Sequence, residues 1–119
     1  MNALHPTPEM LAAWAASDNP NRVVMLNLLR FKRGGGSKSY GEYAREFEKI
    51  LNAHGGKFLF LGRCAEMLVG NEEWDAIALV EYPSRKVFVD VVTKPEVKKI
   101  GEFREAGLDR TILYAIDPR

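Results

Sequence analysis

The sequence predicts an α+β fold, a ferredoxin-like β-α-β-β-α-β sandwich preceded by an extra N-terminal helix. Three observations predict it. The apolar run over residues 23–32 has no helical period, which indicates a buried strand. Residues 40–54 change to apolar spacings of i, i+3 and i+7, which are typical of an amphipathic helix. Two further apolar stretches separated by a turn then indicate a pair of antiparallel strands, and strand, helix, strand, strand is half of such a sandwich.

A short helix is expected to open the chain. Thr7 is a suitable N-cap, Pro8 and Glu9 suit the first turn, and the stretch 18–20 ends the helix. We therefore divide the chain into an N-terminal helical extension, residues 1–20, and a main domain, residues 21–119.

The amphipathic helix is expected to end at Gly55, because glycine accepts the positive φ that follows many helices. Gly62 predicts a bulge or bend in the strand that follows. Cys64 in that strand is expected to be a small core residue. The predicted strands are 57–69 and 74–82, with a turn at 70–73.

The segment after Tyr82 is ambiguous. The letters VFVDVV favour a strand by propensity, whereas Ser84 is a helix-cap signal and the apolar residues that follow have helical spacing. We predict a helix, a break near Thr93 and a second helix that ends at Gly107, followed by a strand over 110–116. The inward residues of the second helix are predicted to be Val97, Ile100, Phe103 and Leu108.

The charges of the chain nearly cancel, with 17 basic and 16 acidic side chains and a formal net charge of +1. That balance argues against a nucleic-acid partner, which needs a basic excess. No signal peptide is visible, and no apolar run reaches the ~20 residues that span a bilayer. The one cysteine excludes an internal disulfide. We expect a cytoplasmic protein with neither a nucleic-acid nor a membrane partner.

A sheet with both helices on one face leaves its other face uncovered. If water covered that face, each strand would alternate apolar and polar residues. Instead both sides of the strands are apolar in 23–29, 58–61 and 76–80. A patch of roughly ten such side chains exceeds what monomers usually expose. We therefore expect a homodimer in which a second copy covers this face.

Several segments together resemble one family. They are VVMLNLLRFK, the glycine-ended helix before GGKFLFLG, EWDAIALVEYPS and REAGL. From Asn21 to Pro118 the chain resembles the small bacterial proteins of the domain of unknown function 1330 family, in the dimeric α/β-barrel superfamily. The resemblance implies that two sheets close face to face into a dimeric barrel, with a small cleft in each subunit or at the seam. Relatives in the superfamily include cofactor-free monooxygenases, muconolactone-type isomerases, haem-degrading proteins and ligand binders, so the fold alone does not choose an activity.

Asn27 is the first candidate binding residue, because a buried amide must pair its polar atoms. It either pairs across the sheet or orients the carbonyl or phenol of a ligand. Trp74 and Tyr82 flank Ala76 and Ala78 on one face of the third predicted strand. Two small residues between two aromatic ones leave room for a flat ligand, or let a helix pack closely.

Three further residues are candidates for ligand binding. Arg63 lies in the second predicted strand, Glu81 near the end of the third, and His54 at the end of the amphipathic helix. A desolvated Glu81 would serve as a general base, although acids at strand ends are usually solvated. We assign no catalytic residue. Metal-ligand spacings such as HExxH are missing from the sequence, and we expect neither a metal nor a cofactor.

The stretch RGGGSKS, residues 33–39, is not a nucleotide-binding Walker loop, because Ser39 stands where that motif requires glycine. We interpret Gly34–Gly36 as part of a loose connection, with a weak anion site at the following helix as the alternative.

The sequence thus predicts a protein that binds a small apolar carbonyl or phenolic molecule, with cofactor-free isomerisation or oxygenation as the chemistry such a cleft would support. The alternative is a non-catalytic dimeric interaction protein with no ligand pocket, which a fully packed interior would favour. Haem binding is a third interpretation.

Overall fold

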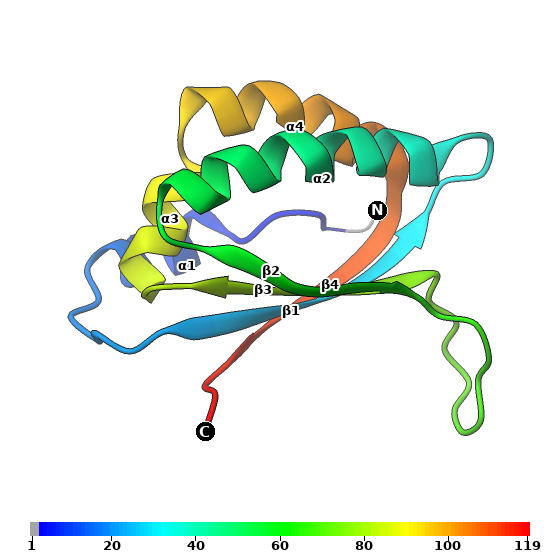
Figure 1. Ribbon diagram of the computed structural model, residues 1–119, viewed down its shortest axis with the longest axis horizontal. Helices are drawn as coiled ribbons and strands as arrows, with labels where there is room; N and C mark the ends of the chain where they lie inside the picture. The colour runs from blue at the N-terminus through cyan, green and yellow to red at the C-terminus, as the bar shows by residue number, and fades with distance from the viewer. Residues whose placement is uncertain (1–2) are drawn as a thin grey trace.

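The computed structural model describes residues 3–119 and has one antiparallel sheet with helices packed over one face (Figure 1). The elements in chain order are α1 (Pro8–Ala15), β1 (Val23–Phe31), α2 (Gly36–Ala53), β2 (Lys57–Arg63), β3 (Ala76–Tyr82), α3 (Arg85–Val92), α4 (Pro95–Gly107) and β4 (Leu108–Ile116). The strand order is β2-β3-β1-β4, and every neighbouring pair is antiparallel. The predicted ferredoxin-like α+β sandwich is confirmed. Within one chain the sheet is open at both edges and does not close into a barrel.

The helix boundaries follow the predicted cap signals. The hydroxyl of Thr7 accepts a hydrogen bond from the backbone N–H of Met10, and that of Ser84 accepts one from Val87, each at 3.2 Å. Gly55 ends α2 with a φ of +82°. In the ambiguous segment the helical alternative is confirmed, because a capped helix that buries Phe88, Val89 and Val91 outweighs β-propensity.

The second strand is shorter than predicted. It ends at Arg63 rather than at residue 69, and its register shift lies between Phe58 and Phe60 rather than at Gly62. The last backbone hydrogen bond between the segments of β2 and β3 runs from the N–H of Cys64 to the carbonyl oxygen of Asp75 at 2.8 Å. Asp75 is also held to β1, where its N–H donates to Leu29 and its carboxylate accepts from the N–H of Phe31, both at 2.8 Å. Residues 64–75, which we call the arm, form no strand.

The arm corrects a second expectation as well. Cys64 is exposed rather than part of the core, since it lies just beyond the end of β2. Leu68 and Val69 are 90% and 94% exposed. Figure 1 shows the arm extending past the sheet on the side away from α2 and α4.

The core lies between the sheet and the helices. Its largest fully buried side chains are Leu29, Leu51, Leu108, Val23 and Val91. The helices α2 and α4 meet at Gly36 and Gly107 with no room for a side chain: a Cβ added at Gly107 would lie 2.5 Å from the Gly36 carbonyl oxygen, and one at Gly36 would lie 2.6 Å from that of Gly107. The third glycine of the RGGGSKS stretch is thus a buried helix contact and the first residue of α2, rather than part of a loose connection.

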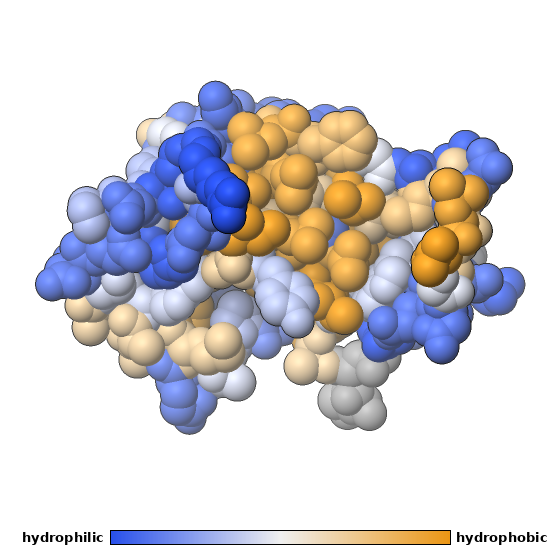
Figure 2. All heavy atoms as spheres, turned by 90° about the horizontal axis from the view of Figure 1, so that it is seen from below, coloured by the Kyte–Doolittle hydropathy of each residue, from blue (hydrophilic) through white to orange (hydrophobic). Residues whose placement is uncertain are grey.

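The opposite face of the sheet carries a continuous apolar surface, which we call the outer face (Figure 2). The register places Leu26 beside Leu79 of β3 and Tyr114 of β4. Phe60 and Tyr114 on this face are 55% and 62% exposed. Further apolar residues that the register places on the outer face are Val24, Leu28, Ile77, Ile112 and Ile116. Both faces of the sheet are therefore apolar, as the sequence predicts, and only one of them is covered within the chain.

No helix within residues 3–119 is both long enough and apolar enough to span a membrane.

Candidate functional site

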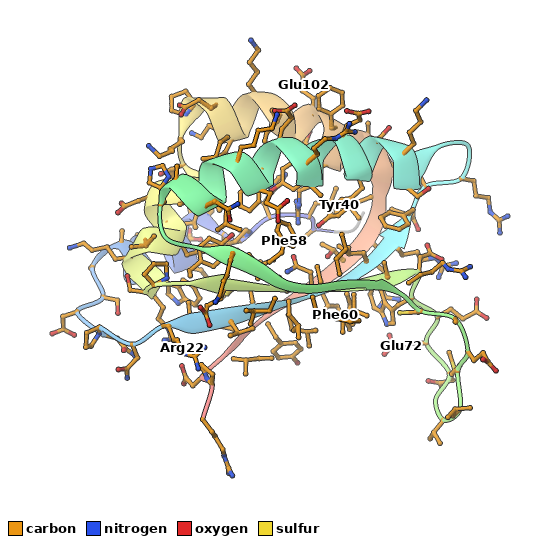
Figure 3. The ribbon with its side chains drawn as sticks, viewed as in Figure 1. Arg22, Tyr40, Phe58, Phe60, Glu72 and Glu102 are labelled. Carbon is orange, nitrogen blue, oxygen red and sulfur yellow. The ribbon has the colours of Figure 1, made fainter. Side chains whose placement is uncertain are left out.

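A cavity of about 440 Å³ lies between the inner face of the sheet and the helices α2, α3 and α4. This volume falls within the range of small-molecule sites. Most of its wall is apolar, with Phe47 from α2, Phe58 from β2 and Val80 from β3. Its polar side chains include Asn27, Tyr40, Tyr43, Tyr82 and Arg104. Figure 3 shows Tyr40 and Phe58 in the space between α2 and the sheet, while Phe60 lies below the sheet on the outer face.

Asn27 supports both interpretations made from the sequence. Its side-chain amide donates to the carbonyl oxygens of Met25 and Ala78, at 3.2 and 3.4 Å, which is the structural pairing across the sheet. Its Oδ1 accepts no hydrogen bond from residues 3–119. Because Asn27 lines the cavity, that oxygen remains able to accept a hydrogen bond from a ligand.

Three tyrosines bring hydroxyl groups to the same cavity. Tyr40 and Tyr43 come from the buried face of α2, with ring centroids 5.6 Å apart, and Tyr82 comes from the end of β3. They are only 6%, 9% and 3% exposed. Within the described part of the chain their hydroxyls make no hydrogen bond. The side chains are buried but their hydroxyl oxygens reach the open space of the cavity, so three unpartnered hydroxyls indicate a place for a polar ligand atom.

Burial raises the pKa of Tyr40, Tyr43 and Tyr82 above the ordinary value of 10.0, because the apolar surroundings disfavour the phenolate. For Tyr82 the two other tyrosines add to that rise. Arg104 is close enough to all three to lower each pKa against the effect of burial. At neutral pH the three side chains are therefore hydrogen-bond donors without charge.

Arg104 forms the polar end of the cavity and was not predicted from the sequence. Its Nη1 donates to the carbonyl oxygen of Leu4 at 2.5 Å, which holds the N-terminal segment against α4. The next residue, Glu105, lies 2.8 Å from Nε2 of His5. Residues 4–6 thereby form part of the cavity wall.

The raised tyrosine pKa values predict a loss of stability in alkali. Above pH 10 the unfolded chain releases phenolic protons that the folded chain retains, so the free energy of unfolding should fall as the pH rises past 10. Below that pH these groups contribute no pH dependence. Urea unfolding at a series of alkaline pH values measures the slope.

Phenolate absorbance gives an independent check on the same groups. In the native protein Tyr40, Tyr43 and Tyr82 should stay protonated at alkaline pH values at which the same residues ionise in urea. Ionisation of all four tyrosines of the chain near pH 10 in the folded protein would contradict the prediction.

Of the six candidate residues predicted from the sequence, the structure brings Asn27 and Tyr82 together at this cavity. The other four lie elsewhere. Trp74 precedes β3 and packs on the Arg110 guanidinium, 4.9 Å from the ring centroid. Glu81 faces the outer side of the sheet and forms an ion pair with Arg22.

Arg63 and His54 are also remote from the cavity lining. Arg63 is exposed at the end of β2. His54 follows the last residue of α2, where its Nδ1 donates to the carbonyl oxygen of Ile50 at 2.8 Å. The small residues Ala76 and Ala78 are buried and do not line the cavity, so they leave space for packing rather than for a ligand.

The sequence contains a partial indication of the cavity residues that we did not predict. Tyr40 and Tyr43 belong to the apolar spacing of residues 40–54, which indicates a buried helix face and does not indicate a binding site. On α4 the choice of Phe103 as an inward residue was wrong: it is 45% exposed, and Arg104 takes the inward position. The spacing i, i+3, i+7 from Val97 leads to Ile100 and Arg104, so the signal was a cation on an otherwise apolar face.

Within residues 3–119 no three His, Cys, Asp or Glu side chains lie close enough together to hold a metal ion. The polar groups at the cavity include three phenols, an amide and a guanidinium, which suit an organic ligand.

A family model matches residues 36–116, more than half of the chain, and is described as a domain of unknown function (DUF1330). The chain belongs to the DUF1330 family. The resemblance seen in the sequence is thus confirmed, and the matched region includes α2, β2, β3, α3, α4 and β4.

Solved structures agree with this assignment. The RPA0582 protein from Rhodopseudomonas palustris, described as a protein of unknown function, is 28% identical with a TM-score of 0.90, and the match covers 100% of this chain and 98% of that one. A dabb family protein with a ferredoxin-like fold from Mesorhizobium loti is 13% identical with a TM-score of 0.61, covering 82% and 97%. Hydroxynitrile lyase from Passiflora edulis is 10% identical with a TM-score of 0.66, covering 84% and 95%. At the identities of the last two the likeness is one of fold. No curated protein matches the sequence.

Proposed function

We propose that this DUF1330 protein binds a small, largely apolar carbonyl or phenolic molecule in the cavity between its sheet and helices. The observation that carries the proposal is the set of three tyrosine hydroxyls, without a partner in the described chain, that face a cavity of about 440 Å³. A ligand oxygen would satisfy donors that otherwise lose the hydrogen bonds they make with water. The apolar wall would take the body of the ligand.

The same groups favour a reaction in which negative charge develops on a carbonyl oxygen. Neutral phenols and the Arg104 guanidinium would stabilise an enolate-like oxygen better than a neutral carbonyl. Proton transfer, isomerisation and cofactor-free oxygenation of a substrate that supplies its own reactivity all pass through such a species. The alternative of an interaction protein without a pocket is disfavoured by the size of the cavity.

Binding is tested with the matched variants Tyr82→Phe and Tyr114→Phe. Each removes one hydroxyl, but Tyr82 lines the cavity while Tyr114 lies on the outer face. Ligand-observed NMR with a library of small aromatic ketones, lactones and phenols would identify a compound that binds. Calorimetry would then measure its affinity. Tyr82→Phe should weaken binding by about threefold to tenfold, since one hydrogen bond contributes about 1 kcal/mol. Tyr114→Phe should leave it unchanged.

Asn27→Ala should also lower the affinity for the compound. Circular dichroism would check that this variant is folded. The proposal fails if no compound in the library binds, or if the affinity is the same in the unmodified chain, Tyr82→Phe and Asn27→Ala.

We also propose that the functional unit is a homodimer joined through the outer face. The surface is apolar across all four strands, and its ion pairs lie at its margin, such as Arg22 with Glu81 and Arg30 with Asp109. A second identical sheet is apolar in the same way, so two copies related by a twofold axis would cover each other. The arm extends on this side of the sheet and carries the exposed residues Leu68 and Val69, which supports a contact between the arm and a second copy.

A further inference from the structure

Arg104 is a cation without a carboxylate partner at the edge of a largely apolar cavity. A guanidinium carries five N–H donors, and within residues 3–119 the one protein acceptor it reaches is the uncharged carbonyl of Leu4. The acidic residue on the cavity wall, Glu105, is already paired with His5 at 2.8 Å. A cation in surroundings of low polarity is costly to leave without a counter-charge.

The groups around Arg104 favour an anion. The three tyrosine hydroxyls near it are protonated at neutral pH and donate hydrogen bonds without adding negative charge. Lys98 also lines the cavity, so the wall carries the two cations Lys98 and Arg104 against the one carboxylate of Glu105. The rest of the wall is aromatic or aliphatic, including Phe47 and Phe58, whose ring centroids are 6.5 Å apart and whose planes are nearly perpendicular at 88°.

We propose that the ligand of this cavity is a small organic acid, whose carboxylate binds the guanidinium of Arg104 and the adjoining tyrosine hydroxyls while its flat apolar body lies against Phe47 and Phe58. This inference rests on the proposed function and adds the charge of the ligand. A carboxylate matches the planar fork of an arginine with two parallel hydrogen bonds. Asn27 on the sheet side is left to accept a hydrogen bond from a hydroxyl or amide substituent of the acid.

The test compares acids with neutral compounds of the same shape. Benzoate, 4-hydroxybenzoate and 2-naphthoate are each paired with the corresponding primary amide, and their affinities for the unmodified protein are measured by calorimetry or NMR titration at low salt. The acid of at least one pair should bind about tenfold or more tightly than its amide, because charge-assisted hydrogen bonds are roughly twice as strong as neutral ones.

Two substitutions assign the effect to one residue. Arg104→Gln should remove the preference for the acid, because the affinity for the acid should fall about tenfold or more while the affinity for the amide stays the same. Arg104→Lys keeps the charge without the planar fork and should retain part of the preference. Arg45→Gln removes an exposed cation from the outer side of α2 and should change neither affinity. The acid and amide comparison needs no variant, so it stands even if Arg104→Gln releases the N-terminal segment.

The outcomes separate this inference from the proposed function. If acid and amide bind equally and Arg104→Gln changes neither, the organic-acid inference is overturned while binding at the cavity stands. If none of the six compounds binds and the wider library of neutral carbonyl and phenolic compounds also gives no ligand, both are overturned. If acids bind but Arg104→Gln binds them as the unmodified protein does, the anion site lies elsewhere and the inference is overturned.

Discussion

A Leu26→Asp variant is expected to be monomeric at micromolar concentration, whereas the unmodified chain of 13.4 kDa is expected to sediment with twice that mass. Leu26 lies in the middle of the outer face, between Leu79 on one neighbouring strand and Tyr114 on the other. In a monomer the introduced carboxylate would face water. In a dimer it would be buried in an apolar seam, at a cost of about 4 kcal/mol, which corresponds to roughly a 1000-fold weaker association.

A second variant tests the arm without risk to the fold of one chain. Leu68 and Val69 are 90% and 94% exposed, so replacing both with serine removes almost no contact within the chain. The fold of a single chain of the double variant should be as stable as that of the unmodified chain. Its dimer should have a higher dissociation constant. Phe103→Lys is the control, because Phe103 is 45% exposed on α4, on the helical side of the molecule, and its replacement should leave the dimer intact.

The dimer proposal would be wrong if the unmodified chain sedimented as a 13.4 kDa particle at these concentrations. It would also be wrong if Leu26→Asp remained a dimer, since no interface that buries the centre of the outer face tolerates an unpaired carboxylate there.

Gly107→Ala is expected to destabilise the protein strongly. The added Cβ would lie 2.5 Å from the carbonyl oxygen of Gly36 and 2.8 Å from the backbone nitrogen of Tyr40. Both are backbone atoms of α2, so relief requires the two helices to separate rather than one side chain to turn. Overpacking of this kind costs about 3 kcal/mol, measured as a lower midpoint in urea unfolding.

The same substitution should weaken ligand binding, because Arg104 and Tyr40 flank the contact on α4 and α2. Gly41→Ala is the matched control. Gly41 is an exposed glycine in α2 with nothing within 4 Å of an added Cβ, so alanine there should stabilise the protein by about 1 kcal/mol through helix propensity. Equal unfolding midpoints for Gly107→Ala and the unmodified chain would show that the helices do not meet as closely as described.

Local signals in the sequence predicted most of the elements, for reasons that depend on near neighbours in the chain. Thr7 and Ser84 cap helices through hydroxyls that reach a backbone N–H three residues on. The apolar spacing in residues 40–54 fixes which side of α2 is buried. The order of strands and helices then predicted a ferredoxin-like sandwich. Alternate residues of a strand face opposite sides of a sheet, so the sequence also predicted that both faces are apolar.

What depends on distant parts of the chain could not be predicted in this way. The second strand ends at Arg63, and the arm that follows is closed by Asp75, which bonds both to Cys64 and to Leu29 and Phe31 of β1. The roles of Trp74 and Glu81 depend on Arg110 and Arg22, which the sequence alone does not place beside them.

By itself, therefore, the sequence determined the fold class, the helix caps and the two apolar faces of the sheet, because each follows from residues within a turn or a strand of one another. Only the tertiary structure decided where the site lies. Its three tyrosines, its asparagine and its arginine come from α2, β3, β1 and α4. The close contact of Gly36 with Gly107 sets the spacing of the helices that carry Tyr40, Tyr43 and Arg104. A cavity is the space that packing leaves between elements, so it is a property of their arrangement in three dimensions and not of any single segment.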